Sequence, residues 1–296
     1  MNRFAPIILL PFLLLCAALA AHLQSHPFPV PHSPSPVPHS QFSTLNSPSP
    51  QADLVIALLG GFRSIAAEVV WFRAERLQDS GRYAELAQLA AWLTFLEPHT
   101  PEVWSYAAWN LAYNVSVMMP TPEDRWRWVE AGLKLLRDDG LRLNPGDGTL
   151  HREIAWLFLA KIGGSLDDAS PYYRSAWKGK VESARASGDW SGLKLDPALM
   201  SAIDSDYGKQ DWTHPYASSL YWAHRGLSLS TDPLARRELR HLLVQSLMLE
   251  CISDASKAPR TLAEMRAAYA EFPSRMLEDM MARFRAKFPN SEPSGR

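Results

Sequence analysis

A stripe of polar side chains interrupts an apolar stretch near the middle of the 296-residue chain. Asn110, Tyr113 and Asn114 in AAWNLAYNVS recur at positions i, i+3 and i+4, so on a helix they share one face. Amide and phenol groups both donate and accept hydrogen bonds, so this stripe could bind the backbone of a peptide. The alternative is that the three residues satisfy buried backbone groups within the fold.

Trp126 and Trp128 are a second pair of candidate partner-binding residues. They stand two positions apart and cannot both face the same way on a helix, so we expect one of them to be partly exposed. An exposed aromatic face would serve to bind a partner. The other tryptophans on apolar faces are expected mostly to fill space between helices; these are Trp71, Trp92, Trp104, Trp109 and Trp156.

Combinations of residues that could carry catalysis or bind a metal are weak in this sequence. His151, Glu153 and the pair Asp167-Asp168 could be imagined as metal ligands, but neighbouring aspartates at a helix start are explained by the helix dipole. The sequence contains no G-x-S-x-G, no H-E-x-x-H and no P-loop. We therefore predict no catalytic residue, no metal and no cofactor, and we expect that the protein is not an enzyme.

Helices must position these residues, because apolar side chains from about residue 53 onward recur at spacings of three and four. One predicted stripe joins Ile65, Val69, Phe72, Arg76 and Leu77, and another joins Leu86, Leu89, Ala90, Leu93 and Leu96. Helix starts are marked by a capping residue followed by proline at Thr100-Pro101, Thr121-Pro122, Asp196-Pro197 and Asp232-Pro233. Thr261-Leu262-Ala263-Glu264 has the pattern of a capping box. Residues 188–213 are expected to form a long loop with one short helix.

Residues 80–104 (SGRYAELAQLAAWLTFLEPHTPEVW) show the pattern of a helical repeat. Gly81 makes a turn, Pro98 ends the second helix 17 residues later, and Trp104 opens the next unit. This pattern resembles the tetratricopeptide repeat family, most clearly over residues 62–160 and over about half of the chain. The resemblance implies antiparallel helix pairs stacked into a right-handed superhelix with a concave binding surface.

The repeat pattern weakens away from this first unit. Val70 and Leu86 depart from the family pattern. A second unit over 101–145 is longer than the family standard, and a third begins near Gly148. The chain is also similar to bacterial membrane-anchored, repeat-like proteins that begin with an apolar LGGF-R segment, here 59–63, and that similarity implies no activity.

The sequence of residues 1–21 indicates that the chain is exported from the cytoplasm. Residues 4–21 (FAPIILLPFLLLCAALAA) carry no charge and follow Arg3, as in a secretory signal, and small residues allow cleavage after Ala20. The run is also long enough to span a bilayer, and we favour an uncleaved anchor over a cleaved signal. Arg3 predicts a cytoplasmic N-terminus. The body is then membrane-anchored and periplasmic, or secreted if the signal is cleaved.

Composition separates three further parts of the chain. Residues 22–52 are rich in proline, serine and histidine and are expected to form a disordered linker. Residues 53–289 carry the helices, and residues 290–296 are expected to be a disordered tail. The formal net charge of −1 gives no sign of nucleic-acid binding, and two cysteines exclude a disulfide framework.

These observations predict an all-α, membrane-tethered, extracytoplasmic scaffold that mediates protein–protein interaction. Its expected partners are an unknown protein or peptide and, through the N-terminal helix, the membrane. Two alternatives stay open: a structural subunit of a membrane complex, and an enzyme or envelope-polymer-binding protein on an α/α superhelix.

Overall fold

The computed structural model describes residues 63–165 and 167–292 of the chain. The predicted signal or anchor, the linker and residues 293–296 lie outside the described residues. The chain divides into two compact units, residues 1–97 and 98–296. Every regular element of the described part is a helix, which confirms the all-α prediction. Within the same residues, no helix is both long and apolar enough to cross a membrane.

The described part of the first unit is a hairpin of α4 (Arg63–Asp79) and α5 (Tyr83–Leu96). Gly81 turns the chain between them with a φ of 69°, a left-handed conformation that favours glycine. The predicted stripe on α5 is buried, as expected. Of the stripe predicted on α4 only Leu77 is buried, whereas Ile65 and Val69 are exposed and Phe72 is 62% exposed. Contact with α5 is made instead by a face with two small residues, which consists of Ala67, Val70, Ala74 and Leu77.

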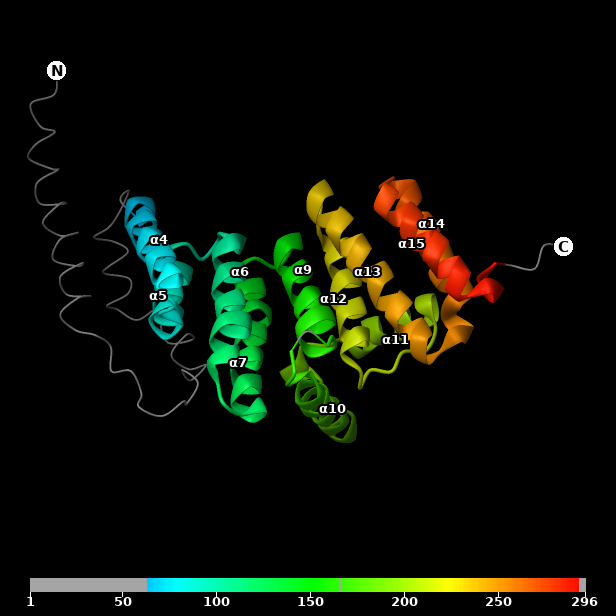
Figure 1. Cartoon of the computed structure of the whole chain (residues 1–296), viewed down its shortest axis with the longest axis horizontal. Coiled ribbons are helices and arrows are strands. Elements are labelled where there is room, and N and C mark those ends of the chain that lie inside the picture. Colours follow the sequence, from blue (N-terminus) through cyan, green and yellow to red (C-terminus); the bar gives the residue numbers. More distant parts are fainter. Residues whose placement is uncertain (1–62, 166, 293–296) are drawn as a thin grey trace, which may run out of the picture. The chain divides into compact units, whose positions relative to one another are not determined.

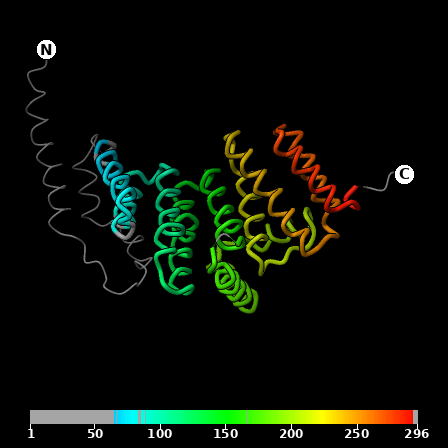
Figure 2. Tube along the Cα trace, in the orientation of Figure 1, coloured from blue at the N-terminus to red at the C-terminus, as the bar shows by residue number. Residues whose placement is uncertain are grey.

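The second unit is a succession of helices that follow one another along the chain (Figures 1 and 2). Its first half contains α6 (Pro101–Trp109), η2 (Asn110–Val115), η3 (Ser116–Met118), α7 (Pro122–Lys134), η4 (Leu135–Gly140), α8 (Leu141–Leu143), α9 (Gly148–Trp156), η5 (Leu157–Ile162) and α10 (Ser170–Ser187). Its second half contains η6 (Ser191–Leu193), α11 (Pro197–Tyr207), α12 (Pro215–Leu229), α13 (Pro233–Ser253), η7 (Ala255–Lys257), α14 (Ala258–Glu271), α15 (Arg275–Lys287) and η8 (Pro289–Ser291).

The helix starts of the second unit agree well with the sequence. α6, α7, α11 and α13 begin at the predicted prolines, and the side chains of Thr121, Asp196 and Asp232 accept capping hydrogen bonds from backbone N–H groups. The predicted capping box at Thr261 is wrong, because α14 begins three residues earlier, at Ala258. Thr261 is instead buried inside the helix, where its hydroxyl lies 3.2 Å from the thiol of Cys251.

Two further expectations concern segments without a clear repeat. Residues 188–213 contain the short turn η6 and the 11-residue helix α11, which agrees with a loop carrying one short helix. Three residues of the predicted tail, 290–292, lie in or beside η8. There Ser291 is buried and Glu292 forms ion pairs with Arg266 and Arg285.

Three helices of the second unit contain a π-helical turn, which the sequence did not predict. η2, η4 and η5 directly continue α6, α7 and α9 without a break in the helix. A π-helical turn contains more residues than an α-helical turn, and such turns are frequent at functional sites. All three carry polar residues that are buried: Asn110 in η2, Arg137 and Asp139 in η4, and Lys161 in η5.

Close packing joins α9, α12 and α13 in the second unit. A chain of buried serine hydroxyls crosses it: Ser246 donates to Ser219 (2.9 Å), and Ser219 donates to the carbonyl of Ala155 (2.8 Å). Gly226 of α12 faces His151 of α9 and Leu239 of α13. A Cβ at residue 226 would lie 2.7 Å from the His151 Cβ and 2.9 Å from both Leu239 methyl carbons. The absence of a side chain therefore sets the distance between these helices.

The variant Gly226→Ala is expected to lower the free energy of unfolding by about 1–3 kcal/mol, because the added methyl group overfills a packed contact. Urea unfolding followed by far-UV circular dichroism measures the loss. Gly179→Ala is the matched control, since Gly179 is exposed in α10 and its added Cβ meets nothing within 4 Å. The control should gain about 0.5–1 kcal/mol from helix propensity. Equal effects of the two variants would contradict the close contact.

Candidate functional site

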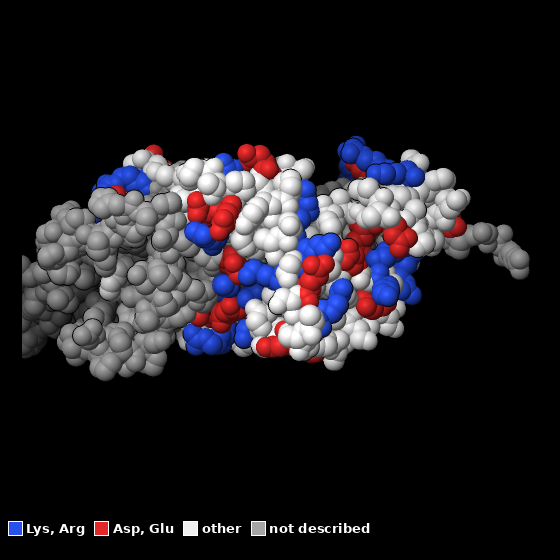
Figure 3. Space-filling view, turned by 90° about the horizontal axis from the view of Figure 1, so that it is seen from below, with Lys and Arg blue, Asp and Glu red and all other residues white. Residues whose placement is uncertain are grey.

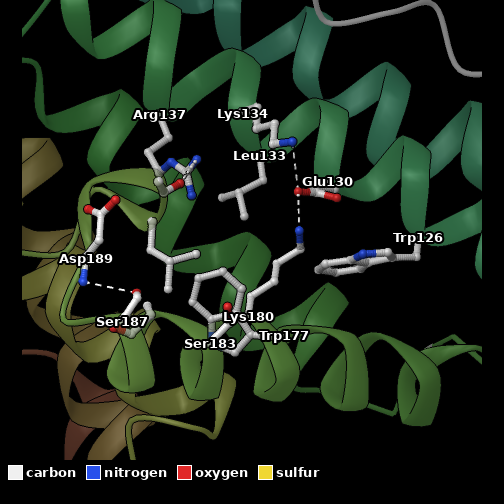
Figure 4. Close-up of a pocket in the computed structure, with 13 residues that line it drawn as sticks. Trp126, Glu130, Leu133, Lys134, Arg137, Trp177, Lys180, Ser183, Ser187 and Asp189 are labelled. Carbon is white, nitrogen blue, oxygen red and sulfur yellow. Dashed lines mark hydrogen bonds and ion pairs between the residues drawn. The ribbon is translucent and has the colours of Figure 1, made fainter.

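A cleft of about 350 Å³ lies between α7 with η4 on one side and α10 with η6 on the other (Figure 4). We call it the α7–α10 cleft. Thirteen residues line it: Trp126, Glu130, Leu133, Lys134, Arg137, Trp177, Lys180, Ser183, Ala184, Ser187, Asp189, Gly192 and Leu193. The cleft thus combines an apolar lining with charged groups of both signs.

One wall of the cleft comes from a single face of α7 and its π-helical continuation. Glu130, Leu133, Lys134 and Arg137 recur at spacings of three and four, so they stand one above another. The N-terminus of this helix is capped, because the Thr121 hydroxyl accepts a hydrogen bond from the backbone N–H of Asp124. Sequence reasoning missed this face, although its spacing is visible in the sequence.

The opposite wall comes from α10 and the turn that follows it. Trp177, Lys180 and Ala184 face the cleft, and Trp177 and Ala184 are buried. α10 ends at Gly188, which has a φ of 71° and lets the chain reverse toward η6. Leu193 of η6 then closes the lining with a buried apolar side chain.

Glu130 links the two walls electrostatically. The ammonium groups of Lys134 and Lys180 each lie 2.9 Å from its Oε1 atom, and Figure 4 shows the three side chains meeting across the cleft. Burial alone would raise the pKa of Glu130, but hydrogen bonds from Lys180 and Lys134 outweigh it and lower the pKa. Two cations therefore share one carboxylate, so this group of three side chains has a net positive charge.

Arg137 lies at the other end of the cleft and is held in place. Its side chain is almost fully buried and forms two hydrogen bonds with the carboxylate of Asp138. It also donates to the backbone carbonyl of Gly192 at 3.1 Å. These contacts fix η6 against η4, so Arg137 shapes the cleft more than it offers a free charge to it.

Trp177 contributes an unused hydrogen-bond donor. The residue is 1% exposed and lines the cleft, and its indole Nε1 has no hydrogen-bond partner among the described residues. A buried N–H without an acceptor costs free energy, and this nitrogen is shielded from solvent by its surroundings. The lining offers apolar contact, hydrogen bonding and ion pairing.

The structure brings only one of the five predicted partner-binding residues, Trp126, into the cleft. Trp126 and Trp128 are both buried, so the expectation that one is partly exposed is wrong. α7 contacts η2, η3 and α10, and a helix covered by several neighbours buries residues that stand two positions apart. Trp126 packs against Tyr173 of α10, with the ring centroids 5.9 Å apart.

The Asn/Tyr stripe lies in η2 and is mostly enclosed. Asn110 is buried and accepts a hydrogen bond from Asn114 at 3.2 Å, while its own amide nitrogen has no partner among the described residues. Tyr113 and Asn114 are half-buried. Trp109 was expected to fill space between helices, but it is 44% exposed and stacks on Tyr113 with centroids 4.0 Å apart. Partner contact by this stripe stays a prediction.

A buried ion pair adjoins the stripe. The Lys161 ammonium of η5 lies 5.1 Å from the Tyr113 ring centroid and 2.6 Å from the carboxylate of Asp167. The hydroxyl of Tyr173 and the backbone N–H of Ala169 also donate to Asp167. Burial alone would raise the pKa of Asp167, but these hydrogen bonds, with that of Lys161 first, hold it below its usual range.

The side chains that the sequence offers as metal-ligand candidates make other contacts in the structure. Asp167 pairs with Lys161, Asp168 with Arg125, and His151 lies 2.7 Å from the carbonyl of Asp147 through Nδ1. Over 63–165 and 167–292, no group of three His, Cys, Asp or Glu side chains gathers in a metal-binding arrangement. Lysine, arginine and acidic side chains are interspersed over the face drawn in Figure 3 and form no large patch of one sign.

The described part of the chain is all-helical and has a cleft between its helices. Comparison of the chain with family models, curated proteins and solved structures gives no match in any of the three. The resemblance to tetratricopeptide repeats therefore stays a prediction from sequence.

Proposed function

We propose that the chain is a helical scaffold that binds a protein partner through the α7–α10 cleft. Its N-terminal apolar segment would tether it to a membrane, with the helical body on the extracytoplasmic side. The observation that carries this proposal is a cleft that combines the apolar side chains of Leu133, Trp177 and Leu193 with two lysines at Glu130.

A protein segment satisfies the groups of the cleft in a simple way. An apolar side chain of the partner would lie on Leu133 and Leu193. A partner carboxylate could pair with Lys134 or Lys180, while the other lysine keeps Glu130.

The tether is supported by the sequence. The uncharged run 4–21 after Arg3 is suited to membrane insertion, and the proline-rich residues 22–52 would hold the body away from the bilayer. A tethered binding module gains from a high local concentration of partners in the same membrane.

One labelling experiment tests both the location and the cleft. Ser183→Cys places an accessible thiol at the cleft, while the native Cys251 is buried. Intact cells are treated with a membrane-impermeant maleimide that carries a photo-crosslinker, and then illuminated. We expect the variant to be labelled and to crosslink to a discrete protein. Adding Lys180→Ala should weaken the partner about fivefold, because the one lysine left at Glu130 stays paired with it and no cation remains for a partner carboxylate.

Glu182→Cys is the matched control, because Glu182 is exposed on the same helix and does not line the cleft. It should be labelled equally and should not form the crosslink. Protection of both thiols in intact cells would contradict the extracytoplasmic location. Equal crosslinking from both positions would contradict binding in the cleft. The unsubstituted chain gives the background from its own cysteines.

A further inference from the structure

A second depression, of about 360 Å³, lies near the C-terminus between α13 and α15. We call it the C-terminal groove. Its lining is mainly apolar and is formed by Met248, Leu249, Ile252, Met280, Phe284 and Phe288. Ile252 is 63% exposed although it is strongly apolar, and Met248 and Met280 are only partly buried. Methionine side chains adapt to different surfaces, so a lining of this kind suits an apolar ligand of variable shape.

The charges of the C-terminal groove all have one sign. Arg283 and Lys287 stand four residues apart on α15 and line the groove, and no carboxylate does so. Neither cation forms an ion pair among the described residues, whereas the nearby Arg266 and Arg285 are both paired with Glu292. Carboxylates of a bound partner would therefore complement the groove.

We propose that the C-terminal groove binds an amphipathic helix of a partner protein that carries acidic side chains beside its apolar face. A helix is about 10 Å wide and can lay apolar residues at i, i+3, i+4 and i+7 into a depression between two helices. A flat bilayer cannot enter such a concave surface. The groove is separate from the α7–α10 cleft, so this proposal does not depend on the function proposed above.

The test uses two fluorescein-labelled synthetic helical peptides with the same leucine face. One carries glutamates on its remaining positions and the other carries lysines. Fluorescence anisotropy measures their binding to the full-length protein. We expect the glutamate peptide to bind at least about tenfold more tightly. The double variant Arg283→Glu with Lys287→Glu should reverse this preference, and Ile252→Asp should weaken the glutamate peptide at least about tenfold.

The matched control is Arg237→Glu with Arg275→Glu, which makes the same change of charge at exposed residues outside the groove. It should keep the preference for the glutamate peptide. Equal affinity of the two peptides, or the same reversal in the control, would overturn the proposal. It would also be overturned if the peptides fail to bind while the groove variants abolish self-association in ultracentrifugation or binding to phosphatidylserine vesicles. All groove substitutions lie on exposed side chains, so circular dichroism should show unchanged helix content.

Discussion

Replacement of Asp167 by alanine is expected to destabilise the second unit by about 3–5 kcal/mol, because it leaves the Lys161 ammonium buried without a counter-charge. The two side chains are only 4% and 5% exposed, so water cannot replace the lost carboxylate. The variant also removes the acceptor of the Tyr173 hydroxyl and of the Ala169 backbone N–H. Chemical denaturation followed by tryptophan fluorescence measures the loss.

Asp168→Ala is the matched control for this prediction. Asp168 precedes the same helix and also pairs with Arg125, but its side chain is 85% exposed, so its loss should cost less than about 1 kcal/mol. The double variant Lys161→Met with Asp167→Leu should recover most of the stability, since it removes both buried charges together. Similar losses for Asp167→Ala and Asp168→Ala would show that burial of the ion pair is not what matters.

Acidification from pH 6.5 to 4 is expected to remove about 3 kcal/mol of stability through His151 alone. Burial lowers the pKa of His151 from its ordinary 6.5 to about 4, against a smaller opposite effect of its hydrogen bond with the Asp147 carbonyl. Between these two values the unfolded chain binds a proton that the folded chain does not. The contribution of neutral His151 is therefore complete above pH 6.5 and is lost as the pH falls toward 4.

Equilibrium unfolding at a series of pH values checks the expectation, with His151→Gln as the test variant. Carboxylates also titrate in this range, so the informative quantity is the difference between the original chain and the variant. That difference should change by about 3 kcal/mol across the interval. His99→Gln, at an exposed histidine, should leave the profile unchanged. Parallel profiles for the original chain and His151→Gln would contradict the assignment.

Local signals in the sequence predicted the fold class and the starts of α6, α7, α11 and α13, because caps and prolines act within a few residues. The signal at Thr261 failed, since a threonine followed by a glutamate three residues later also occurs inside a helix. Which side chains are buried depends instead on how the helices pack. Both Trp126 and Trp128 are buried because α7 has neighbours on several sides, and Phe72 is exposed because α5 packs on another face of α4.

The candidate cleft was harder to predict than the helices that form it. The spacing of Glu130, Lys134 and Arg137 shows one face of α7, and the spacing of Trp177 and Lys180 shows one face of α10. Neither pattern says that the two faces meet, because that depends on which helices become neighbours. The Asn/Tyr stripe was predicted from the spacing within one helix, and the sequence did not reveal that Lys161 and Trp109 would lie against Tyr113.

The π-helical turns change the direction in which each face of a helix points. One added residue advances a helix by about 100°, so the faces before and after the turn point in different directions. The two parts of one continuous helix can then contact different neighbours. Here α6 contacts α9, while η2 packs mainly on α7. Each turn also moves the later residues out of step with a fixed repeat length. Such phase changes would weaken any fixed spacing of apolar residues along the sequence.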